Sequence, residues 1–176
     1  MRPVDVLKAI KGRRSIRAFK SKDVPKEIVE KLINAATQAP SAGNIQPWDF
    51  IIVRKPELKR ALAEAALEQT FIEEAPVVIV VCADENRSSY RYGMRGKALY
   101  CLQDTAAAIQ TILLAAYSSG LGTCWVGAFT EEKTREILKI PIGVRSVALI
   151  ALGYPDEAPP PRSRRPINQI VHYETF

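Results

Sequence analysis

Two short stretches of the chain are apolar almost without interruption, and they limit the folds that it can adopt. The run that follows Pro76 reads VVIVVCA, and most of its residues are β-branched. A second run, VALIALG, follows Ser146. A strand with one face in water alternates polar and apolar residues, whereas a continuous apolar run is typical of a strand buried on both faces. We therefore expect buried strands at 75–84 and 145–155, the first of them central in its sheet.

Helical patterns lie between these strands. Segment 98–122 is apolar almost all round, which predicts a long, central and buried helix. Amphipathic helices are expected at 23–40, 56–69 and 130–140, and further strands at 49–55 and 123–129. A short helix near the start is built on Val4, Leu7 and Ile10, with Pro3 in its first turn and Gly12 at its exit. The polar segment 85–97 is expected to be a loop or a short helix. Helices and strands thus intermix in one domain, 1–176, of the α+β or α/β class.

The last segment, 155–176, has two features that conflict within one compact domain. Its three consecutive prolines force an extended path. Its later residues are partly apolar and require burial: Ile167, Ile170, Val171, Tyr173 and Phe176. An extended arm that packs on a partner subunit satisfies both features, so we expect an intertwined dimer.

Cysteine and histidine usage excludes several classes of protein. The three cysteines are widely spaced in apolar segments, which indicates reduced, buried thiols rather than disulfides or a metal site. His172 is the single histidine, so a serine or cysteine hydrolase would lack its base. The first residues lack the pattern of a signal peptide, and we see no membrane span. A cytoplasmic location is expected.

Positive charge is concentrated at the two ends of the chain. The net charge is +6, and six arginines at 13–17 and 162–165 account for that whole excess. Two tight clusters suggest a small polyanion such as a phosphate, gripped from both ends. Ser15 adds a hydroxyl that can donate to a phosphate oxygen. Charge alone leaves a second reading open, in which both clusters are solvated basic loops.

The loop at 38–50, QAPSAGNIQPWDF, has the composition of a rigid ligand-binding turn. Pro40 and Pro47 stiffen it, and its small residues leave backbone N–H groups open to a flat heteroaromatic ring. An ordinary turn with Trp48 in the core explains the loop equally well when it is considered alone. We expect Trp125 to be a core residue.

The motifs in combination resemble the FMN-dependent nitroreductase family. They are RRSIRAF, APSAGNIQPWDF, APVVIVV, GLGTCWVGAF and RSRRP, in that order and at the family's spacing. The resemblance extends from about residue 5 to residue 171. It implies an α+β fold with a mostly antiparallel sheet flanked by helices, and a homodimer with exchanged C-terminal arms and FMN at the subunit interface.

The resemblance also implies which residues hold FMN. They are Arg13, Arg14, Ser15 and Arg17; Pro40, Ser41, Ala42, Asn44 and Gln46; Gln69, Gly127 and Ala128; and Arg162 with Arg164. Arg13 and the tail arginines would bind the phosphate, and Arg17 the pyrimidine edge. The loop at 40–46 would come from the other subunit, and Gly127–Ala128 would lie near flavin N5. No catalytic side chain and no metal are expected, because the flavin carries the chemistry.

The implied activity is hydride transfer from NAD(P)H, through FMN, to a nitroaromatic, quinone or similar small acceptor in a ping-pong cycle. Segment 85–97 is short for the family's helical insertion, which indicates a compact member with an open site. Tyr90, Tyr92 and Arg95 could line that site or be solvated loop residues. A specialised flavoenzyme, for reductive dehalogenation or flavin modification, is the first alternative. A basic module that binds nucleic acid is the second, although we expect no nucleic-acid or membrane partner.

Overall fold

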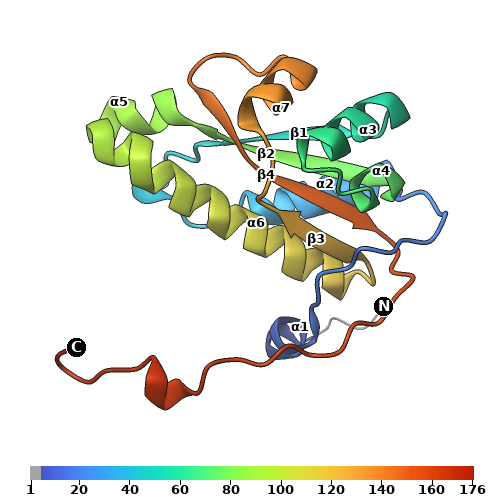
Figure 1. The fold of residues 1–176 in the computed structure, drawn as a ribbon. Coiled ribbons are helices and arrows are strands. Elements are labelled where there is room, and N and C mark those ends of the chain that lie inside the picture. The colour runs from blue at the N-terminus through green and yellow to red at the C-terminus, as the bar shows by residue number, and fades with distance from the viewer. Residues whose placement is uncertain (1–4) are drawn as a thin grey trace.

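The computed structural model describes residues 5–176 and is built around one four-stranded sheet (Figure 1). Its spatial order is β1–β2–β4–β3, and every neighbouring pair is antiparallel. The strands are β1 (Trp48–Val53), β2 (Val77–Asp84), β3 (Gly122–Val126) and β4 (Val144–Gly153). The predicted α+β class with a mostly antiparallel sheet is confirmed.

The two apolar runs form the two central strands. Ile79 of β2 pairs with Ile150 of β4, and both side chains are fully buried. Successive side chains of a strand point to opposite faces. The neighbouring residues Val78 and Leu149 accordingly belong to a second apolar cluster on the other face. Continuous apolar sequence is required here because both faces of the sheet are covered.

Helices cover both faces. The cluster that holds Ile79 also holds side chains of α2 (Lys26–Ala36) and α6 (Cys101–Ser118). The cluster that holds Val78 includes α3 (Pro56–Ala65), α4 (Phe71–Glu74) and α7 (Glu131–Leu138). In Figure 1, α6 runs along one side of the sheet, and α3, α4 and α7 lie on the other. The buried residues of α2 are Val29, Leu32 and Ala36.

Segment 85–97, expected to be a loop or a short helix, is helical. It forms α5 (Glu85–Arg95), and a π-helical turn, Gly96–Tyr100, joins it to α6. Gly93 breaks the helix with a φ of 54°, a conformation that side chains other than glycine rarely adopt. The expected long helix therefore begins at Cys101, later than the sequence pattern suggested.

The helical stretch Glu85–Ser118 is, by length and composition, one that could cross a membrane. Its α6 part instead packs on the sheet through Ile109, Ile112 and Ala116, which are buried. The prediction of a central helix is confirmed for this face. The rest of the α6 surface is not fully buried within one chain, because Leu102, Ala106 and Leu114 are only half-buried.

The two ends of the chain expose apolar side chains. Helix α1 (Val6–Gly12) buries only Ala9, whereas Leu7 and Ile10, predicted as part of an apolar stripe, are exposed. Pro3 and Val4 lie outside the described residues. From Ala158 onward the tail is almost entirely exposed and nearly without regular structure, apart from the 3-10 turn Ile167–Gln169.

Two further expectations concern single residues. Cys82, Cys101 and Cys124 are free and buried, as predicted, and burial raises the pKa of Cys82 to about 12. The prediction for Trp125 is wrong, because its side chain is 40% exposed on the edge strand β3. An indole on an edge strand has a neighbour on one side only, and sequence pattern does not reveal which strand is at the edge.

Candidate active site

The arginine cluster at 13–17 is fixed where α1 meets the sheet. Gly12 ends α1 directly against the ring of Tyr117 on α6, a position with no room for a Cβ atom. The buried residue Ile16 donates its N–H to the carbonyl of Thr123 at 2.9 Å, and Ser15 forms a bridge with the same residue. The arginine segment thus runs beside the start of β3.

The end of β4 brings the tail to the same place. Lys20 N–H donates to the Tyr154 carbonyl, and Asp156 N–H donates to the Ala18 carbonyl, both at 2.9 Å. The carboxylate of Glu157 accepts the backbone N–H groups of Arg17 and Ala18. Backbone contacts therefore attach the tail to the arginine segment up to Glu157, and only beyond it does the chain leave the domain.

These contacts bring the two arginine clusters together around one cavity of about 390 Å³. Its lining consists of Arg13, Arg14, Ser15, Arg17, Arg162 and Arg164, with Glu157, Pro159 and Pro160. The prediction that both ends of the chain line one pocket is confirmed. Arg17, Arg162 and Arg164 are exposed to solvent at this cavity.

Positive charge in this cavity is not neutralised by the protein. Glu157 is its one acidic residue, and one oxygen of that carboxylate already accepts backbone N–H groups. In the described part of the chain, none of the five arginines lies within 4.0 Å of a carboxylate oxygen.

The Nε atom of Arg14 also indicates that the cavity can accept an anion. This atom is buried, and no hydrogen-bond partner is found for it among residues 5–176. A buried donor without a partner is unfavourable by roughly 1–3 kcal/mol. An anion with several oxygens, such as a phosphate, fits this donor set.

A second group of predicted residues lies next to Arg17. Its guanidinium carbon is 5.7 Å from the centre of the Phe71 ring, at the start of α4. Two residues earlier, Gln69 donates its Nε2 to the carbonyls of Ala66 at 2.8 Å and Ala128 at 3.2 Å. Among residues 5–176 no hydrogen bond to its amide oxygen is found, so this oxygen is left as an acceptor. The structure thereby joins Gln69 to Ala128, and Gly127 and Ala128 are both exposed.

The loop 40–46 lies at the opposite end of α6. Ala42 N–H donates to Oδ1 of Asp104 in the first turn of α6 at 3.1 Å, whereas the arginine segment meets α6 at Tyr117. At a rise of 1.5 Å per residue, these two points on α6 are about 20 Å apart. Within one chain, the structure therefore does not bring Pro40, Ser41, Ala42, Asn44 or Gln46 to the arginine cavity.

The loop 40–46 has a strained backbone that several contacts hold in place. Gly43, Asn44 and Gln46 have φ values of 56°, 55° and 54°, and such values are unfavourable for the two residues that are not glycine. Ser41 Oγ accepts the Gln46 N–H at 3.0 Å, and Gln46 Nε2 donates to Asn44 Oδ1 at 3.2 Å. Strain of this kind is typical of functional loops.

Helix α5 also contacts this loop, which sequence reasoning missed. Arg87 donates to the Gln46 carbonyl and Arg91 to the Gly43 carbonyl, each at 3.3 Å. The four-residue spacing of these arginines places both on one face of a helix, which was one of the two forms expected for 85–97. Asp104 and Glu157 were missed as well, because they act on backbone N–H groups distant in sequence.

The nitroreductase family model matches residues 10–74 and 66–154. The chain belongs to the nitroreductase family. A protein of Archaeoglobus fulgidus named NADH dehydrogenase/NAD(P)H nitroreductase is 40% identical over 157 residues, covering 87% of each chain. An FMN reductase [NAD(P)H] of Bacillus subtilis is 30% identical and covers 98% of this chain and 74% of its own. The structure of an NADPH:FMN oxidoreductase from Vibrio harveyi, complexed with NAD+, aligns with a TM-score of 0.89 at 27% identity, over 97% of this chain and 77% of that one.

Asp104 provides a test of how the loop 40–46 is held. Burial raises the pKa of its carboxyl above the ordinary 3.8, and the Ala42 N–H opposes this shift. The native state then keeps a proton that the unfolded state has released, so this group makes the protein less stable as pH rises through that window. Asp104→Asn keeps an acceptor for Ala42 and removes the charge. We expect its free energy of unfolding to fall less than that of the wild type between about pH 4 and pH 7.

Urea denaturation across this pH range measures the effect. Asp104→Ala is the matched variant, because it leaves the Ala42 N–H without its acceptor and should lower the free energy of unfolding by about 1–3 kcal/mol. Equal pH dependence in the wild type and Asp104→Asn would contradict the assignment.

Proposed function

We propose that this protein oxidises NAD(P)H with bound FMN and passes the electrons to a small acceptor, such as a nitroaromatic or a quinone, in a ping-pong cycle. Membership of the nitroreductase family makes the chain an oxidoreductase, with FMN as cofactor and NAD(P)H as co-substrate. The acceptor, the ping-pong order and the residue roles are our proposal. A cytoplasmic location stays a prediction.

The observation that carries the proposal is the cavity between the two ends of the chain. Five arginines surround it without an ion-pair partner among the described residues, and the buried Nε of Arg14 lacks an acceptor. A phosphate monoester supplies negative charge and several acceptor oxygens to such a site. A nucleic-acid module would instead spread its positive charge along a face.

The chain's own residues would have three roles. Arg13, Arg14 and Ser15, with Arg162 and Arg164, would hold the phosphate by charge-assisted hydrogen bonds. FMN, when bound, supplies hydride acceptance and donation, so the chain needs no nucleophile.

The other two roles belong to residues that would surround the isoalloxazine ring of FMN. Arg17, beside Phe71, would place positive charge on the pyrimidine side, where reduction adds negative charge. Gln69 would accept a hydrogen bond there through its free amide oxygen, and Gly127 and Ala128 would offer exposed backbone near N5.

Loop 40–46 would complete the site from a second subunit. One chain cannot place this loop on a ligand held in its own arginine cavity, because the two lie about 20 Å apart along α6. A homodimer with the cofactor between the subunits removes this difficulty. The half-buried apolar residues of α6 and the exposed Leu7 and Ile10 of α1 are suitable surfaces for such an interface.

The tail 155–176 would contribute to the same dimer. Ile167, Tyr173 and Phe176 are 73%, 85% and 106% exposed, which is unusual for apolar side chains in one segment of a folded chain. A groove of about 700 Å³ runs between α2 and β1, an edge strand of the sheet. Ile33, Phe50 and Ile52 contribute its apolar lining. The arm of a partner is the occupant that we propose for it.

An absorption spectrum tests the proposed function. Purified protein is titrated with FMN and then with NADH or NADPH under nitrogen. We expect a bound-flavin band that either nucleotide bleaches, and whose return on adding a quinone or nitroaromatic measures acceptor use. Bound FMN that neither nucleotide reduces would favour the specialised flavoenzyme, and the absence of FMN binding would contradict the proposal.

Arg13→Gln tests the phosphate site. A charge-assisted hydrogen bond contributes about 1.5–3 kcal/mol, so the dissociation constant of FMN should rise at least about tenfold. Riboflavin lacks the phosphate, and its dissociation constant should change by less than about twofold. Arg135→Gln, an exposed arginine of α7, is the control with the same loss of charge. Equal losses for FMN and riboflavin would contradict a phosphate contact.

Ile167→Asp tests the arm. A buried, unpaired carboxylate is unfavourable at an apolar interface, so light scattering should show the mass shifting from dimer towards monomer at micromolar concentration. Thr175→Asp adds the same charge at a polar position of the same segment and should leave the mass unchanged. A wild-type monomer, or a dimer unaffected by Ile167→Asp, would refute the arm exchange.

A further inference from the structure

An open pocket of about 590 Å³ lies beside loop 40–46 and is not used by the flavin contacts proposed above. It is lined by Ile45 of the loop and by Arg87, Tyr90 and Arg91 of α5. Residues three and four apart lie on one face of a helix, so these three side chains form one surface.

This surface joins an exposed aromatic ring to the guanidinium groups of Arg87 and Arg91. Tyr90 is 96% exposed. Arg91 has no carboxylate within 4.0 Å in the chain from residue 5 onward, and its guanidinium carbon lies 5.5 Å from the centre of the Tyr92 ring. The nearest carboxylate oxygen to Arg87 is that of Asp84, at 3.7 Å.

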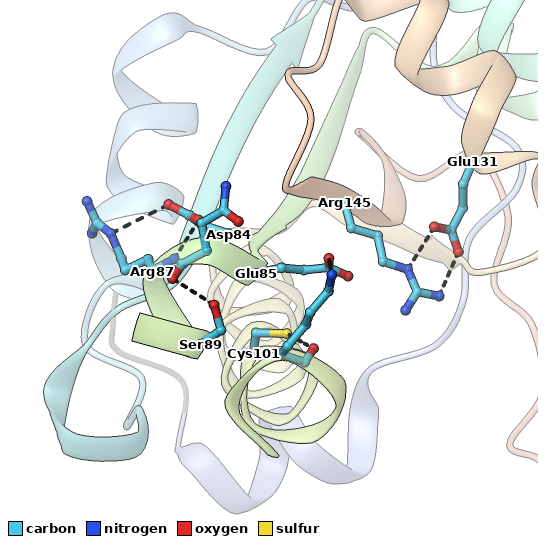
Figure 2. A network of polar contacts seen from close by, with 9 residues as sticks. Asp84, Glu85, Arg87, Ser89, Cys101, Glu131 and Arg145 are labelled. Carbon is cyan, nitrogen blue, oxygen red and sulfur yellow. Dashed lines mark hydrogen bonds and ion pairs between the residues drawn. The ribbon is translucent and has the colours of Figure 1, made fainter. Parts of the chain in front are cut away.

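The surface is also held rigidly. Asp84 ends β2 and caps α5 by accepting the Arg87 N–H at 2.9 Å, as Figure 2 shows. Lys97 pairs with Glu85 at 3.4 Å and ties the start of α5 to the π-helical turn that follows it. The contacts of Arg87 and Arg91 with loop 40–46 each use one nitrogen, so most of their N–H groups stay available.

We infer that Arg87, Tyr90 and Arg91 bind the phosphate-bearing adenosine half of the pyridine nucleotide. A purine ring stacks on an exposed aromatic side chain, and guanidinium groups bind phosphate. The chain has no glycine-rich loop for a dinucleotide, so side chains must supply this contact. The extra 2′-phosphate of NADPH adds charge that the two arginines can bind, so NADPH is the preferred donor. The inference rests on the proposed function, because loop 40–46 is proposed to border the flavin.

Adenosine 2′,5′-bisphosphate is the probe, because it carries both phosphates but no nicotinamide. Calorimetry on the FMN-loaded protein should show that it binds the wild type. Its dissociation constant should rise at least about tenfold in Tyr90→Ala and in Arg91→Gln, which corresponds to about 1.4 kcal/mol. Arg135→Gln is the control and should bind as the wild type does. Adenosine 5′-monophosphate should bind more weakly than the bisphosphate to the wild type.

Two readouts separate this inference from the proposed function. The dissociation constant of FMN, measured for each variant, shows whether Arg91→Gln or Tyr90→Ala has disturbed loop 40–46. If the wild type binds FMN and NADPH reduces it, but neither variant weakens the bisphosphate, the proposed function stands and this site is wrong. No binding of the bisphosphate to the wild type would overturn the site too. Failure to bind FMN would overturn the function itself.

Discussion

The constraint on which the proposed site depends is the close approach of five positively charged side chains. Arg13, Arg14, Arg17, Arg162 and Arg164 come from opposite ends of the sequence and surround one cavity. Their mutual repulsion opposes this arrangement, so other interactions must hold the segments in place. Backbone hydrogen bonds do this: they join residues 16–20 to Thr123 on the edge strand β3 and to the segment that follows the central strand β4. Glu157 is the one acidic residue of the cavity, and it adds contacts to the backbone N–H groups of Arg17 and Ala18.

Helix α6 separates the two groups of proposed cofactor-binding residues, because each group lies at a different end of it. The arginine cavity is near Tyr117 and the strained loop 40–46 is near Asp104, and each is braced by its own neighbours. Neither end alone resembles a complete flavin pocket. The apolar surfaces exposed on α1, α6 and the tail suggest a dimer in which the arginine cavity of one chain meets loop 40–46 of the other. Burial in such a dimer would explain why these apolar side chains are exposed in a single chain.

The sequence predicted most of the fold because local patterns determine it. The continuous apolar runs identified β2 and β4, and clustered arginines identified a shared pocket. For α5 the sequence left a loop or a short helix open, because its polar composition and Gly93 are compatible with both. The exposure of Leu7 and Trp125 was missed because burial depends on neighbours that no local pattern reveals. Asp104, Glu157 and Arg91 were missed as parts of the site because they contact backbone far away in sequence, which only the folded chain brings within reach.

The closure of the arginine cavity by the last part of the chain has a consequence for biosynthesis. Residues 13–17 are synthesised long before Arg162 and Arg164, so the lining of the cavity stays incomplete until residue 164 has been translated. A nascent chain can therefore fold its helices and begin its sheet while two of the five arginines of the cavity are missing. On the proposal that these arginines bind the flavin phosphate, a chain that stops before residue 162 would bind FMN more weakly than a longer one, and binding of the cofactor would follow translation of the tail.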